Sequence, residues 1–245
     1  MRSMPFNAFI ASSLICAAVA FLPVPAIARD TCSAADIDIE VSAATRRERE
    51  LVCAGAHQAL ALLALCGIRP RETIDVRIRA EVRHPLAGPI FGYYDLRERH
   101  IILTSLDGLP DLMHGTPYDE LPPTDFYKSL VVHEVVHSVM HQSFGSGVQT
   151  QAAYEYPAYA LQIASLPPPA RAQFMKAFEA ERLQRPVPLS DTILAFAPYF
   201  FAARAYNNFI TSSDGCLLLR EAMKGKIDLI DDAERLVAQR PPNGQ

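Results

Sequence analysis

The 245-residue sequence lacks a long run of basic residues and any internal repeat. Its net charge is −4, and the charged segment TRRERE at 45–50 mixes both signs, as is typical of the solvated start of a helix. A surface that binds nucleic acid needs clustered basic residues. We therefore expect no nucleic acid among the partners of this protein.

A second long apolar run is also missing, because the one such run lies at 8–22. Arg2 precedes this run, two prolines follow it, and the small-residue segment AIA at 26–28 comes next. This order predicts a signal peptide at 1–28 with cleavage after Ala28, and 15 apolar residues are few for a membrane span. We expect a secreted or periplasmic protein whose mature chain has no membrane span.

Cysteine is scarce once the signal peptide is removed, since only Cys32, Cys53, Cys66 and Cys216 remain. An even number of cysteines in an exported protein predicts two disulfides, with buried free thiols as the alternative. Cys53 and Cys66 lie on one predicted helix, roughly 20 Å apart, which is too far for a bond between them. Cys32 and Cys216 then each pair with one helix cysteine, and the sequence leaves open which.

The spacing of apolar residues predicts a mixture of strands and helices, with the helices at about 47–67, 125–143, 154–165, 168–184, 190–212, 215–224 and 228–239. Alternating patterns predict strands at 74–82, 90–96 and 100–106, and the proline- and glycine-containing segment 107–125 predicts a long loop. We predict one α+β domain over 29–240 and a disordered tail at 241–245. In this fold a small antiparallel sheet packs on the 125–143 helix, and the C-terminal part is mainly helical.

The segment HEVVH at 133–137 is the strongest chemical signal in the sequence. On a helix, residues four apart share one face, so His133 and His137 can bind one metal ion. Glu134 projects to the side of that pair, where it can hold a water that the metal also binds. This is the arrangement of a zinc site with its general base. The alternative is a helix with two packed histidines.

A catalytic zinc needs a third protein ligand and one open position. His141 lies eight residues after His133, about 12 Å along the axis, and so cannot bind the same metal. Glu155 opens the next predicted helix and is its only acidic residue; Pro157, which fits only a first turn, places Glu155 near the helix start. Glu155 is the expected third ligand, and a favourable contact with the helix dipole is the other explanation for it.

HEVVH followed by EYPAY at 155–159 resembles the gluzincin zinc metallopeptidases, in which HExxH is followed by a glutamate on the next helix. The likeness spans roughly 60–226 and implies His133, His137 and Glu155 as zinc ligands with Glu134 as base. It also implies Tyr199 as a catalytic residue that stabilises the oxyanion, with Tyr206 as a second candidate and a core tyrosine as the alternative. The glycine-and-glutamate exopeptidase motif is absent, which argues against aminopeptidase action.

These observations predict an exported zinc-dependent peptidase that acts on a peptide or protein substrate. Glu134 accepts a proton from the attacking water and passes it to the leaving amine. The strand at 100–106 is a candidate to pair with an extended substrate. The rival prediction is a non-catalytic exported binding protein that keeps the metalloprotease scaffold, with structural zinc or none. Substrate specificity and oligomeric state stay open.

Overall fold

The structure is a computed structural model that describes residues 30–34, 37–42, 45–85, 88–145, 150–178, 183 and 189–225. The predicted signal peptide, the helix predicted at about 228–239 and the predicted tail at 241–245 lie outside these residues. Within the described residues, no helix is both long and apolar enough to span a bilayer.

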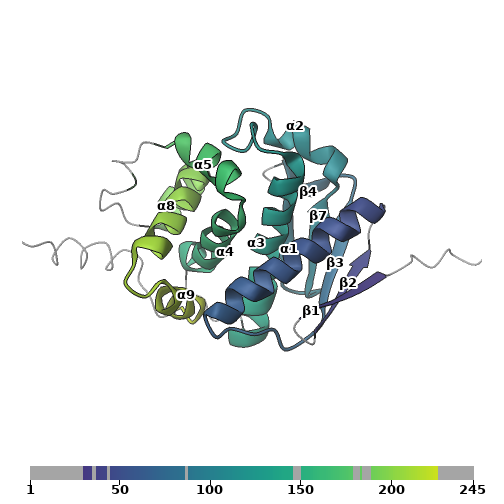
Figure 1. The fold of residues 1–245 in the computed structure, drawn as a ribbon, viewed down its shortest axis with the longest axis horizontal. Coiled ribbons are helices and arrows are strands. Elements are labelled where there is room, and N and C mark those ends of the chain that lie inside the picture. Colours follow the sequence, from purple (N-terminus) through teal and green to yellow (C-terminus); the bar gives the residue numbers. More distant parts are fainter. Residues whose placement is uncertain are drawn as a thin grey trace, which may run out of the picture.

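The fold is α+β, with a small sheet on one side and helices on the other (Figure 1). The strands are β1 (Asp30–Ala34), β2 (Ile37–Ser42), β3 (Ile74–Arg79), β4 (Val82–His84), β5 (Gly88–Ile90), β6 (Gly92–Asp95) and β7 (His100–Thr104). The longer helices are α1 (Arg46–Leu65), α3 (Pro123–Phe144), α4 (Gln151–Ser165), α5 (Pro168–Lys176), α8 (Pro198–Thr211) and α9 (Gly215–Met223). Shorter helices are η1 (Leu106–Gly108), α2 (Leu109–Met113) and α7 (Asp191–Phe196).

The main sheet has the strand order β1-β2-β3-β7-β6, and it is mixed rather than antiparallel as predicted. β2 pairs in parallel with β3, and β3 pairs in parallel with β7, whereas the β1–β2 and β6–β7 pairs are antiparallel. The reason is that α1 connects β2 to β3, and a crossover helix of this kind joins parallel strands. The sequence interpretation missed β1 and β2, although IDIEVS at 37–42 alternates apolar and polar residues.

The core lies between the sheet and the first helix layer. Alternate residues of β2, β3 and β7 are buried on one face, among them Ile39, Val76 and Leu103. α1 contacts β1 and β2, while α3 contacts β6 and β7. The two helices pack closely at Gly55, where an added Cβ would lie 2.7 Å from both the Lys128 carbonyl oxygen and the Val131 Cβ.

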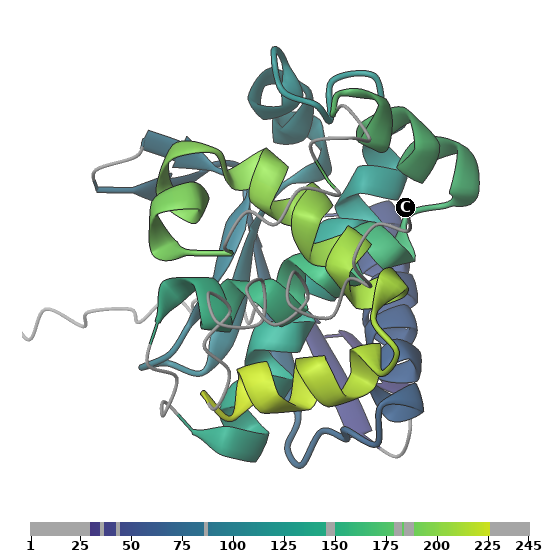
Figure 2. The ribbon, with the colours of Figure 1, turned by 90° about the vertical axis from the view of Figure 1, so that its left-hand side faces the viewer.

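The C-terminal helices form a second layer, in which α4 lies between α3 and α8. Figure 2 is viewed from the side of these helices and shows α8 and α9 in front of α4. The helix predicted over 190–212 is two helices, because Pro198 lacks an N–H and starts α8 instead of continuing α7. The predicted loop at 107–125 includes α2 and part of η1, and it buries Leu109, Met113, Tyr118 and Leu121.

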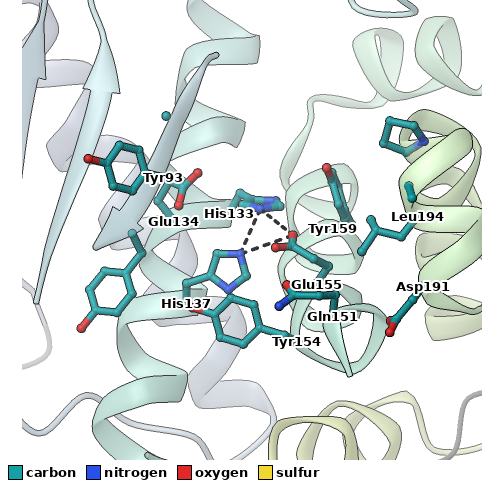
Figure 3. A pocket seen from close by; sticks show the side chains of 14 residues that line it. Tyr93, His133, Glu134, His137, Gln151, Tyr154, Glu155, Tyr159, Asp191 and Leu194 are labelled. Carbon is teal, nitrogen blue, oxygen red and sulfur yellow. Dashed lines mark hydrogen bonds and ion pairs between the residues drawn. The ribbon is translucent and has the colours of Figure 1, made fainter. Parts of the chain in front are cut away.

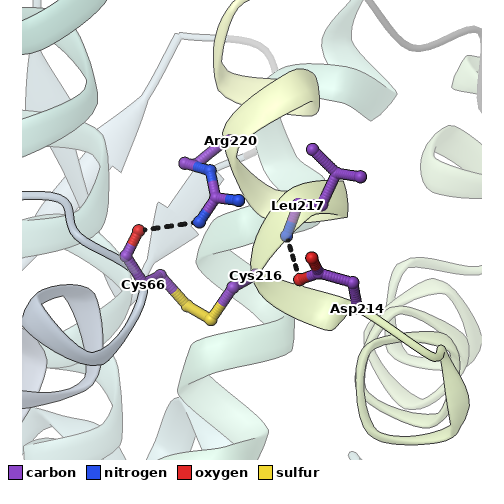
Figure 4. The surroundings of a disulfide bond; sticks show 5 residues. All are labelled: Cys66, Asp214, Cys216, Leu217 and Arg220. Carbon is purple, nitrogen blue, oxygen red and sulfur yellow. Dashed lines mark hydrogen bonds between the residues drawn. A yellow bond between two sulfur atoms is a disulfide. The ribbon is translucent and has the colours of Figure 1, made fainter.

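Two disulfides join α1 to β1 and to α9. Cys32 of β1 bonds to Cys53 of α1, and Cys66 at the end of α1 bonds to Cys216 of α9. Arg220 of α9 also donates a hydrogen bond to the Cys66 carbonyl oxygen at 3.0 Å (Figure 4). The prediction that Cys53 and Cys66 bond to different partners is confirmed, and the structure supplies the pairing.

Candidate metal centre

α3 carries His133, Glu134 and His137 through the middle of the protein. Pro123 occupies the first turn, where its missing N–H costs nothing, and Gly145 ends the helix with a φ of 68°. Residues Leu130 to Met140 are all buried, since sheet, α1 and α4 surround this part of the helix. The helix predicted at 125–143 therefore starts two residues too late and ends one residue too early.

α4 brings Glu155 to the pair of histidines. Thr150 caps this helix by accepting a hydrogen bond from the Ala153 N–H, so the helix starts at Gln151 and Pro157 lies inside it. The expectation that Pro157 marks the first turn is therefore wrong. Pro157 has no N–H to donate to the helix. The start of the helix has a second support besides Thr150, because Asp191 of α7 accepts a hydrogen bond from the Ala152 N–H at 2.7 Å.

The side chains of His133, His137 and Glu155 converge on one point (Figure 3). The two Nε2 atoms lie 3.1 Å apart, and Glu155 Oε2 lies 3.2 Å from the first and 3.4 Å from the second. A tetrahedral zinc with bonds of about 2.0–2.1 Å separates its ligand atoms by about 3.3–3.4 Å. The spacing of the three donor atoms thus fits one metal ion, and this group could hold one.

The charges of this group depend on each other. Burial alone would raise the pKa of Glu155, but the imidazoles of His137 and His133 outweigh burial and lower it well below its usual range. Burial would likewise lower the pKa of His133, yet contact with Glu155 and the charge of Glu134 raise it. Glu155 is therefore a carboxylate that favours a positive charge between the two imidazoles.

Gln162 and Tyr154, also on α4, position the two imidazoles. Gln162 Oε1 lies 3.0 Å from His133 Nδ1, and because an amide oxygen only accepts, Nδ1 carries the proton and Nε2 presents its lone pair to the centre. The Tyr154 ring stacks on the His137 ring with centroids 4.2 Å apart and an interplanar angle of 12°.

Glu134 lies on the β6 side of the imidazoles, opposite Glu155 (Figure 3). It is 3% exposed, and its Oε2 has no hydrogen-bond partner within the described part of the chain. Burial raises its pKa, against the charges of His133 and His137, which lower it, and a hydrogen bond from the Tyr94 backbone also lowers it. A buried carboxylate with a free oxygen beside a metal-ligand group is placed to accept a proton.

A cavity of about 610 Å³ opens onto this group of side chains. The side chains that line it come from β6, α3, α4, α7 and α8: Gly92, Tyr93, Tyr94, His133, Glu134, His137, Gln151, Tyr154, Glu155, Tyr159, Asp191, Leu194, Ala195 and Pro198. Its volume lies within the range of about 300–1,000 Å³ that is usual for ligand pockets.

Comparison with known proteins gives a family but no function. Residues 39–232 match DUF6639, a family of unknown function. The chain belongs to this family. No curated protein and no solved structure matches the chain.

The match to DUF6639 covers all three candidate metal ligands and Glu134. The structure brings together the ligands that the sequence predicted and leaves His141 outside the group. His141 instead lies with Nδ1 2.9 Å from the Tyr94 hydroxyl. Two further acids, Asp191 and Asp214, serve helix starts: Asp191 supports α4, and Asp214 accepts a hydrogen bond from the Leu217 N–H of α9.

Tyr199 and Tyr206 of α8 have different surroundings. Tyr199 lines a second, smaller cavity together with His133 and Glu134, and burial raises its pKa. The Arg171 guanidinium lies over the Tyr206 ring, with its Cζ 5.6 Å from the ring centroid. Tyr206 is not among the residues that line either cavity. Tyr199 is thus the one of the two whose position agrees with a role at the metal centre.

The sequence interpretation missed Tyr159 and Gln162, which face His133 from α4. Tyr159 lies four residues after Glu155 and Gln162 lies seven after it, so all three share one face of the helix. The Tyr159 ring meets the His133 ring edge-on, with centroids 4.6 Å apart. The helical spacing from Glu155 was the signal that could have found both residues.

Proposed function

We propose that the protein is an exported zinc-dependent peptidase of the gluzincin-like type. The observation that supports this most strongly is the convergence of His133, His137 and Glu155 beside Glu134, at the wall of a large cavity. Two imidazoles and one carboxylate are a donor set of catalytic zinc sites, and the fourth position is left for water or substrate. Zinc also fits the ligand spacing described above.

Bound zinc would lower the pKa of a coordinated water and polarise the carbonyl of the scissile bond. Glu134 accepts one proton of the attacking water, and the water oxygen forms a bond to the carbonyl carbon. Glu134 then donates that proton to the leaving nitrogen as the C–N bond breaks, which gives a carboxylic acid and an amine. At neutral pH the acid then loses the second proton of the water to solvent or to the amine. Burial suits Glu134 to both steps because few waters compete for its proton.

The negative charge on the carbonyl oxygen requires a hydrogen-bond donor. Tyr199 is the donor implied by the resemblance to gluzincins, and its place beside His133 and Glu134 in the second cavity supports this role. Tyr159 lines both cavities and offers a second hydroxyl, which makes it the competing candidate.

An extended substrate would pair with β6 rather than with the 100–106 strand. β7 lies between β3 and β6 and is therefore paired on both sides, so the earlier expectation for this strand is wrong. β6 is the edge strand beside the large cavity, which Gly92, Tyr93 and Tyr94 line, whereas β1 forms the other edge of the sheet. A free strand edge offers backbone donors and acceptors to a peptide without regard to its sequence.

Export would agree with the two disulfides, because such bonds persist in oxidising compartments. We expect the mature chain to be secreted or periplasmic. Mass spectrometry of the protein from the producing cell should find an N-terminus near Arg29; an intact N-terminus would argue against export by a cleaved signal peptide.

The test of function compares wild type with Glu134→Gln. Metal analysis of both purified proteins should give about one zinc per chain, since Glu134 is not a ligand. Wild type should cleave a mixture of peptides derived from an unfolded protein. The rate of cleavage by Glu134→Gln should be lower by at least about 100-fold, which is the lower end of the contribution of a proton-transfer residue. Glu98→Gln, a change at an exposed acid of the β6–β7 turn, is the matched control and should cleave normally.

Each other result has a defined meaning. Absence of zinc after supplementation would contradict the whole proposal. Zinc without peptide cleavage by wild type would favour the alternative, a binding protein on a metallopeptidase scaffold. Unchanged cleavage by Glu134→Gln would mean that another group is the base.

A further inference from the structure

A second cavity of about 230 Å³ adjoins the large one behind His133 and Glu134. The two cavities share the lining residues Gly92, His133, Glu134 and Tyr159. The remaining residues of the smaller cavity are Ile90, Phe91, Tyr118, Phe126, Leu130, Gln162 and Tyr199. A group bound in the smaller cavity would therefore lie next to the proposed reacting bond.

Aromatic rings form most of the wall. The ring centroid of Phe126 lies 4.8 Å from that of Phe91 and 4.4 Å from that of Tyr118. The Tyr199 ring meets the Tyr118 ring edge-on, with centroids 5.5 Å apart. The Tyr118 ring also stacks on Phe174, at 5.0 Å, and this contact fixes its orientation. Such a wall favours a flat apolar group, because rings pack against rings in offset or edge-on contacts.

Besides Glu134 Oε2, the Tyr118 hydroxyl is an unusual polar group of this wall. Tyr118 is 2% exposed, and its hydroxyl has no hydrogen-bond partner within the described residues. Buried polar groups are nearly always paired, so an unpaired one at a cavity wall indicates a partner that enters from the cavity. Burial also raises the pKa of Tyr118, so the hydroxyl stays neutral and can both donate and accept.

Size and charge limit what can enter. A cavity of about 150 Å³ lined by apolar groups holds a benzene ring, so about 230 Å³ leaves room for a substituted ring. No lysine or arginine is among the described residues that line the cavity, whereas Glu134 is one of them, so an acidic side chain would be repelled. The group that matches is an uncharged ring with a hydrogen-bonding atom.

We propose that this cavity is a specificity pocket for a phenol side chain, in which the Tyr118 hydroxyl bonds to the hydroxyl of a substrate tyrosine. The assignment of a peptide tyrosine rests on the proposed function, whereas binding of a phenol ring does not. Tyr118 is a specificity-determining residue, because its bond distinguishes tyrosine from phenylalanine while the aromatic wall accepts both.

The first experiment measures binding without any reaction. Dissociation constants of 4-methylphenol and toluene are measured by NMR for zinc-loaded wild type, Tyr118→Phe and Tyr127→Phe. Tyr127 is the matched control, since its buried hydroxyl also has no partner in the described part of the chain, but Tyr127 does not line the cavity. The preference for 4-methylphenol over toluene should fall by about tenfold in Tyr118→Phe and stay unchanged in Tyr127→Phe.

The second experiment measures cleavage of peptide pairs that differ only in tyrosine or phenylalanine beside the scissile bond. Wild type should favour tyrosine in kcat/KM by about tenfold, and Tyr118→Phe should cleave both equally. Binding of neither ring compound, or an equal preference in all three proteins, would overturn the pocket. Ring binding as expected, with no peptide cleaved, would uphold the pocket and contradict the peptidase. Cleavage without tyrosine preference would overturn the substrate assignment.

Discussion

Replacing Gln162 by leucine should weaken metal binding, although Gln162 is not a ligand. Gln162 is 3% exposed, and its Oε1 accepts the hydrogen bond from His133 Nδ1 at 3.0 Å. Leucine has a similar volume and offers no acceptor. The change therefore removes the group that fixes the tautomer and ring orientation of His133, while the packing of α4 on α3 is kept.

The size of the effect follows from two independent considerations. Partners that orient a metal-binding histidine change metal affinity by about 10–100-fold, which is about 1.4–2.7 kcal/mol. A buried N–H left without its acceptor costs about 1–3 kcal/mol. The two ranges agree, so we expect zinc affinity to fall by about 10–100-fold in Gln162→Leu.

The assay is competition for zinc against a chromophoric chelator at fixed pH and salt, because protons compete with the metal for the imidazoles. Gln58→Leu is the matched control. Gln58 of α1 donates a hydrogen bond to the Ser165 carbonyl oxygen at 2.7 Å, so this change also removes one glutamine hydrogen bond. Equal affinity in wild type and Gln162→Leu, or an equal loss in both variants, would refute the reasoning.

Three further predictions concern the ligand set, the oxyanion and the disulfides. Glu155→Ala should lose zinc on dialysis, because only two of the three protein ligands remain; metal content is the measurement. Tyr199→Phe should lower kcat by about 10²–10³-fold and leave KM nearly unchanged, whereas Tyr159→Phe should have a small effect. Replacing both cysteines of one disulfide by serine should lower the free energy of unfolding. The loss should be about 5 kcal/mol for the α1–α9 disulfide, which closes a loop of 150 residues, and about 3 kcal/mol for the β1–α1 disulfide, which closes a loop of 21 residues.

Controls separate these effects from general damage. Asp214→Ala removes a helix cap away from the metal group, and this variant should keep its zinc. Full zinc retention by Glu155→Ala would mean that another residue is the third ligand. A large loss in Tyr159→Phe with none in Tyr199→Phe would exchange their roles. Denaturant unfolding that shows a greater loss for the shorter loop would contradict the entropic argument for the disulfides.

Patterns within one element could be read from the sequence. The four-residue spacing of His133 and His137 fixes a common helix face wherever the helix lies. The incompatibility of Cys53 and Cys66 likewise depends only on the rise of one helix. The position of Pro157 was misread because Thr150 caps the helix, which starts at Gln151 and so places the proline beyond its first turn.

Properties that depend on how elements meet could not be read in this way. The parallel pairing of β2 with β3 depends on the path of α1 across the sheet. The contact of Gln162 with His133 and the cavity beside Tyr118 depend on the approach of α4, α8 and the 107–125 segment to α3.

The sequence by itself determined which chemical groups come together locally, namely two imidazoles and a carboxylate on one helix turn and a glutamate on the next helix. It could do so because helical periodicity sets distances within a helix. Only the tertiary structure decided that Glu155 reaches both imidazoles, that β6 is an edge strand beside the large cavity and that an aromatic pocket lies behind Glu134. These relations are set by packing between segments far apart in the chain, where no local periodicity fixes a distance.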